Sequence, residues 1–98
     1  MKQIKKIVEQ IQEELEGAND YAKLAVQLKG SDPRLAETYA SMAEQELNHV
    51  NRLHDEAVRL INAYPDEPPA AMQAVWDWEH DRMTSHAAAI RVLLNMYR

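Results

Sequence analysis

One helix ends and another begins within Lys29-Gly30-Ser31-Asp32-Pro33. Gly30 suits the left-handed position that follows a helix, Asp32 is a residue type that caps helix N-termini, and Pro33 fits a first helical turn. A second break, Tyr64-Pro65-Asp66-Glu67-Pro68-Pro69, lacks the backbone amides that a continuous helix needs. The sequence therefore predicts one all-α domain over residues 1–98, with long helices near 2–29, 33–63 and 69–97.

Composition narrows the classes of function. The 98 residues include no Cys and only two Gly, and the formal net charge is −5. Without Cys there is no disulfide, thiolate zinc site or cysteine nucleophile, and the acidic balance argues against binding of nucleic acid. No apolar run is long enough to span a membrane, and no hydrophobic stretch follows the N-terminal lysines. We therefore expect a cytoplasmic protein that binds neither nucleic acid nor membranes.

Each of the first two segments carries a mostly apolar stripe at steps of three and four, which is the spacing of a helix face that packs on another helix. Glu14 interrupts the first stripe, and Glu46 and His49 interrupt the second near its middle. The stripe in the first segment comprises Ile4, Ile7, Ile11, Glu14, Ala18, Tyr21, Ala25 and Leu28, and the stripe in the second comprises Leu35, Tyr39, Met42, Glu46, His49, Leu53, Glu56 and Leu60.

The two segments bring these interruptions to one height if they form an antiparallel hairpin. Residues whose numbers sum to about 60 then lie opposite one another, which pairs Glu14 with Glu46 and Tyr21 with Tyr39. Glu46 and His49 are three residues apart, so they lie side by side on one helix face. The sequence thus predicts a layer of two carboxylates and one imidazole.

Such a layer must be paired, protonated or bound to a cation, because an isolated carboxylate in apolar surroundings costs several kcal/mol. Carboxylates with an imidazole suit iron, manganese or zinc, and a Glu facing a Glu-x-x-His pair is half of a dinuclear four-helix-bundle site. A homodimer with a two-fold axis would supply the other half by duplicating Glu14, Glu46 and His49. The alternative is a Glu–His hydrogen-bond network that fixes the helix register without metal.

Three stretches resemble the encapsulated ferritins, and more distantly the rubrerythrins. They are Glu13-Glu14-Leu15-Glu16-Gly17-Ala18-Asn19-Asp20-Tyr21, Ser31-Asp32-Pro33-Arg34-Leu35 and Glu44-Gln45-Glu46-Leu47-Asn48-His49. The resemblance covers about residues 10–62. It implies a ferritin-like hairpin that completes a four-helix bundle by homodimerisation, with dimers associating into a ring.

The resemblance also implies an activity. Glu14, Glu46 and His49 would hold a di-iron site between two protomers. Glu13 and Glu16 would match acidic residues that bind metal at an entry site. Members of the family oxidise Fe(II) with dioxygen inside an encapsulin shell. Residues 94–98 contain no recognisable shell-targeting tail, so the sequence does not itself predict encapsulation.

The remaining candidates have open interpretations. A stripe of acidic residues on the first helix either attracts cations or is a solvated face, and it comprises Glu9, Glu13, Glu16 and Asp20. His54 lies off the apolar stripe and is predicted to be an exposed polar residue. On the third helix, Glu79, His80 and His86 are candidates for joining a metal site if that helix turns them toward the core. The alternative function is a non-enzymatic oligomerisation or partner-binding module, in which the Glu–His layer fixes the register of the helices.

Overall fold

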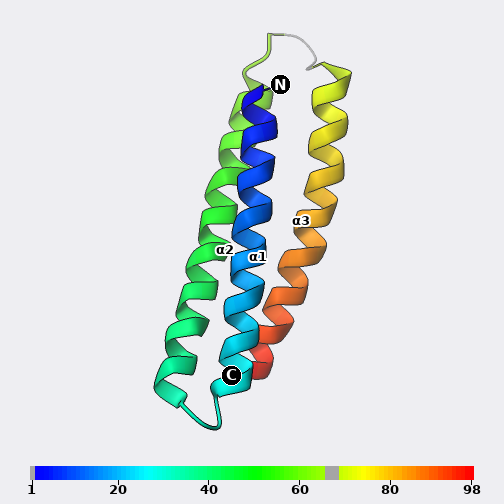
Figure 1. Cartoon of the computed structure of the whole chain (residues 1–98). Helices are drawn as coiled ribbons and strands as arrows, with labels where there is room; N and C mark the ends of the chain where they lie inside the picture. The colour runs from blue at the N-terminus through cyan, green and yellow to red at the C-terminus, as the bar shows by residue number, and fades with distance from the viewer. Residues whose placement is uncertain (1, 66–68) are drawn as a thin grey trace.

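The structure, a computed structural model, describes residues 2–65 and 69–98. Over these ranges the chain forms three helices and no strand, namely α1 (Lys2–Leu28), α2 (Pro33–Asn62) and α3 (Ala70–Tyr97). They lie side by side in a rod of 55 × 17 × 16 Å, with α1 between α2 and α3 (Figure 1). The predicted all-α class is confirmed, and each helix end lies within one residue of its expected position. None of the described helices has the length and apolarity to cross a membrane.

The turn between α1 and α2 follows the sequence signals with one exception. Asp32 caps α2 as predicted, because its Oδ1 accepts a hydrogen bond from the backbone N–H of Leu35 at 3.2 Å. The prediction of a left-handed Gly30 is wrong, since no described glycine has a positive φ. The N–H groups of Ser31 and Asp32 instead both donate to the carbonyl of Leu28, at 3.1 and 2.8 Å. That carbonyl is therefore satisfied without a left-handed residue. Of the second break, Asp66, Glu67 and Pro68 lie outside the described residues.

The interface between α1 and α2 is rich in alanine. Because alanine has a one-carbon side chain, two helices that meet through it approach closely and bring the residues beside the interface near one another. The alanines buried in α1 and α2 are Ala18, Ala22, Ala25, Ala36, Ala40, Ala43 and Ala57. Larger side chains complete this core, and they include the buried Ile4, Ile11, Leu15 and Leu47.

Helix α3 packs mainly on α1 and contacts α2 only slightly. Its buried side chains are Met72, Trp76, Glu79, Ile90 and Leu94. At the end of the rod that contains the α1–α2 turn, Lys29 Nζ donates a hydrogen bond to the carbonyl of Met96 at 2.8 Å. Arg98 also forms an ion pair with Glu44 on α2. These contacts hold the C-terminal end of α3 against the α1–α2 turn.

The predicted stripes of the first two helices are confirmed only in part. In α2 the buried face is turned by one residue, because the buried side chains each follow a member of the predicted stripe, and they are Ala36, Ala40, Ala43, Leu47, Val50, Ala57 and Ile61. In α1 the stripe members Ile4, Ile11, Ala18 and Ala25 are buried as predicted, but the positions between them are displaced by one residue. Val8, Leu15 and Ala22 are buried, whereas Ile7, Glu14 and Tyr21 are only partly buried. The reason is that α3 packs on the side of α1 away from this stripe and so widens the buried face in that direction. The part of the stripe that carries Glu14 therefore lies along an open face of the α1–α2 hairpin.

Candidate metal centre

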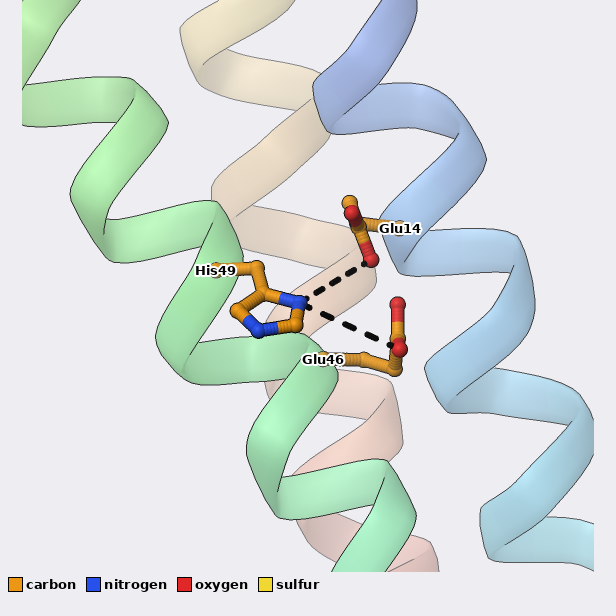
Figure 2. A group of neighbouring side chains, drawn as sticks. All are labelled: Glu14, Glu46 and His49. Carbon is orange, nitrogen blue, oxygen red and sulfur yellow. Dashed lines mark ion pairs between the residues drawn. The ribbon is translucent and has the colours of Figure 1, made fainter.

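Glu14, Glu46 and His49 converge on the open face of the hairpin, as the sequence predicted (Figure 2). Glu14 comes from α1, while Glu46 and His49 lie one helical turn apart on α2. His49 Nδ1 lies 3.5 Å from Oε2 of Glu14 and 3.9 Å from Oε1 of Glu46. One ligand atom from each residue lies within 4.8 Å of the other two. The equal height of Glu14 and Glu46 in an antiparallel hairpin explains this convergence.

The donor geometry suits a single ion held by these three residues. Two atoms that each bind a divalent ion at about 2.1 Å cannot be more than about 4.2 Å apart. Both distances from His49 Nδ1 are within this limit. The two carboxylate oxygens lie at most 4.8 Å apart, so a small rotation of either side chain brings them within the limit as well. The exposed fractions are 29% for the Glu14 side chain, 24% for Glu46 and 49% for His49. The site is thus open to an ion and to further ligands from solvent or from another chain.

The surroundings of the three residues leave space on their open side. A hollow of about 420 Å³ adjoins Glu14 and His49. It is lined by Gln10, Glu13, Glu14, His49, Arg52, Leu53 and Glu56. Gly17 lies beside Glu46, and a Cβ built there would be 3.7 Å from Oε2 of Glu46.

The predicted pairing of Tyr21 with Tyr39 is confirmed, because their rings stack with centres 5.9 Å apart.

The predicted secondary acidic residues differ in their placement. Glu13 is exposed and lines the hollow beside Glu14. Glu16 is also exposed but does not line that hollow, and the other members of the acidic stripe, Glu9 and Asp20, are exposed as well. Among these four residues, the position of Glu13 is therefore the one best suited to guiding a cation toward the three ligands.

The candidates on α3 do not join this centre. Glu79 is 1% exposed and accepts a hydrogen bond from Gln12 Nε2 at 3.0 Å, with Arg82 at 3.5 Å. His86 is partly buried on α3. The prediction that His54 is an exposed polar residue is wrong, because its ring packs on Trp76 and on His80. Both contacts come from α3, whose orientation the sequence did not define.

Arg52 and Glu56 were not predicted from the sequence to belong to this centre. Both line the hollow, and their spacing of three and seven residues after His49 is the signal that places them on the same face of α2. Glu56 is engaged by Arg59, whose Nε donates to it at 2.8 Å. Arg52 brings a positive charge to the rim, which partly offsets the acidic residues there.

Comparison with known proteins adds no assignment to this geometry. No family model matches the chain, and neither the curated proteins nor the solved structures give a match.

Proposed function

We propose that this chain is a ferritin-like metal-binding protein that oxidises Fe(II) at a site built around Glu14, Glu46 and His49. The observation that supports this most directly is the approach of one donor atom from each residue to within 4.8 Å of the others. Two carboxylates and one imidazole form a donor set that suits iron, manganese or zinc. With iron, the same set favours redox chemistry, because ligand positions stay open for dioxygen.

A second copy of the chain is the proposed source of the remaining ligands. The hairpin face that carries the three donors also carries partly buried apolar side chains, including Ile7, Tyr21, Tyr39 and Leu53. A two-fold axis across this face would bury them and place a second set of three donors opposite the first. The proposed assembly is a homodimer or a larger ring of dimers, with two ions between each pair of hairpins.

The proposed reaction treats iron as the substrate. Two Fe(II) ions each lose one electron, and one dioxygen takes up both electrons together with two protons, which yields two Fe(III) and one hydrogen peroxide. Glu14 and Glu46 would supply negative charge that stabilises the Fe(III) product over Fe(II). His49 would supply a neutral nitrogen donor.

Anaerobic titration of the metal-free protein with Fe(II), with the mass in solution followed at each step, tests the proposal. We expect saturation near one iron per chain, a shift of mass to dimers or larger rings, and dioxygen consumption when air is admitted. Glu46→Ala should abolish all three, whereas Glu37→Gln, at an exposed position on the same helix, should change none of them.

Two outcomes would contradict the proposal. Retained stoichiometric iron and oxidase activity in Glu46→Ala would remove this site from the reaction. Absence of tight binding with an unchanged mass would identify the three residues as a structural network and favour the partner-binding alternative. A parallel titration with Mn(II) and Zn(II) separates metal binding from oxidation.

A further inference from the structure

A second group of metal-ligating side chains lies where α2 meets α3. The rings of His54 on α2 and of Trp76 and His80 on α3 contact one another pairwise. The ring centres of His54 and His80 are 5.3 Å apart, and each lies 5.3 to 5.8 Å from the centre of Trp76. Because α2 and α3 otherwise make little contact, these rings are a principal link between the two helices.

The separation of the two imidazoles fits a shared metal ion. A Zn–N bond of about 2 Å places the ion roughly 3 Å from the centre of each ring, and a tetrahedral angle then separates the two centres by roughly 5 Å. The observed separation of 5.3 Å agrees with this value. A stacked aromatic pair can have the same spacing, but two imidazoles also carry the nitrogen donors that a metal needs.

The contact between His54 and Asp55 leaves the Nε2 atom of His54 available to bind a metal. Its Nδ1 lies 3.5 Å from Oδ1 of Asp55. A histidine that binds a metal usually directs its other ring N–H to a carboxylate, which fixes the tautomer. With Nδ1–H directed to Asp55, the lone pair of His54 resides on Nε2. The His54 side chain is 28% exposed, and Trp76, at 8% exposure, lies against both imidazoles.

We propose that His54 and His80 bind a transition-metal ion that prefers imidazole, of the class Zn²⁺, Ni²⁺ or Cu²⁺, and that the bound ion fastens α3 to α2. Water completes the coordination, because both histidines are only partly buried. This site does not depend on the proposed Fe(II) oxidation. It uses nitrogen donors rather than carboxylates, and His54 lies five residues from His49, about 140° around α2.

Trp76 provides the reporter for a direct test, because Ni(II) bound beside an indole ring quenches its fluorescence. The second tryptophan, Trp78, is 60% exposed, so all measurements use the Trp78→Phe background, in which emission comes from Trp76 alone. We expect saturable quenching by about one Ni(II) per chain. His54→Gln and His80→Gln should each weaken, at least tenfold, the Ni(II) binding that quenches Trp76, while the control His86→Gln should leave this quenching unchanged.

Unchanged quenching in both His54→Gln and His80→Gln would overturn the proposal, and so would loss of quenching in His86→Gln. Far-UV circular dichroism checks that each variant is helical. If a variant fails to fold, side-chain ¹H–¹⁵N spectra of the unaltered ¹⁵N-labelled chain, titrated with Zn(II), decide the question. Shifts of the ring nitrogens of His54 and His80 support the site, and shifts confined to other histidines overturn it.

Discussion

Replacing Glu46 by Gln separates a metal centre from a structural network, because the two interpretations predict opposite changes in stability. In the metal-free chain, Glu14 and Glu46 hold carboxylate oxygens within 4.8 Å of each other. A site of this kind stores like-charge repulsion that a bound cation relieves. Removing one of the charges with an isosteric amide should therefore stabilise the metal-free protein. A network that fixes the helix register should instead lose stability.

The size of the effect follows from Coulomb's law. Two unit charges at this separation repel by roughly 1 kcal/mol in water and by roughly 3.5 kcal/mol at the effective dielectric constant of a protein surface. The Glu14 and Glu46 side chains are 29% and 24% exposed, so solvent screens much of the repulsion. We expect Glu46→Gln to raise the free energy of unfolding by about 1 kcal/mol, which corresponds to a rise in Tm of about 4–8 °C.

Thermal unfolding followed by far-UV circular dichroism measures this difference in chelated protein at mildly alkaline pH. Adding Mn(II) should make the unaltered chain unfold at a higher temperature than Glu46→Gln, the reverse of the order without metal. The unaltered chain gains about 2.7 kcal/mol at a ligand concentration one hundred times Kd, and the variant gains little. Glu37→Gln, at an exposed position, should stay within about 0.5 kcal/mol throughout. A metal-free Glu46→Gln that unfolds at a lower temperature than the unaltered chain would refute the reasoning.

Three further substitutions, each measured by urea unfolding, test the packing and the capping of the helices. Gly17→Ala should stabilise the chain by about 0.5–1 kcal/mol, because its Cβ meets the nearest carboxylate oxygen at an ordinary 3.7 Å; a loss of stability would mean that another group occupies this space. Asp32→Ala should cost about 1 kcal/mol through loss of the α2 cap, and Asp32→Asn should restore most of it. Gln12→Ala should cost about 1–3 kcal/mol, because the carboxylate of Glu79 is buried; additivity with Glu79→Leu in a double-mutant cycle would contradict the coupling.

The helices and the height of the candidate centre follow from local sequence signals. Pro33 and the Asp32 cap determine where α2 begins, and the short turn then fixes which residues of α1 and α2 lie opposite each other. Once that register is set, Glu14 and Glu46 must face each other, and the spacing of three places His49 beside them. This is why the three donors were predictable without knowledge of the third helix.

The contacts of α3 were not predictable in the same way. A stripe at steps of three and four, which includes Met72, Trp76, Glu79 and Ile90, does predict the buried side of α3, but no sequence signal indicates which face of the α1–α2 hairpin receives it. Trp76 is buried whereas Trp78 is 60% exposed, although both are tryptophans two residues apart. The burial of Glu79 against Gln12 and the packing of His54 on His80 depend on that choice of face.

The two proposed metal sites should act independently, and their placement explains why. The carboxylate-rich centre lies on the open face of the hairpin, while the histidine pair lies on the side of α2 that meets α3. Variants that share no contact usually change stability additively to within about 0.5 kcal/mol. Combining Glu46→Gln with His80→Gln should therefore give the sum of the separate effects without metal. A deviation from additivity well above 0.5 kcal/mol would mean that α3 transmits changes between the two sites. The stability of the carboxylate-rich centre would then depend on the packing of α3 as well as on the α1–α2 hairpin.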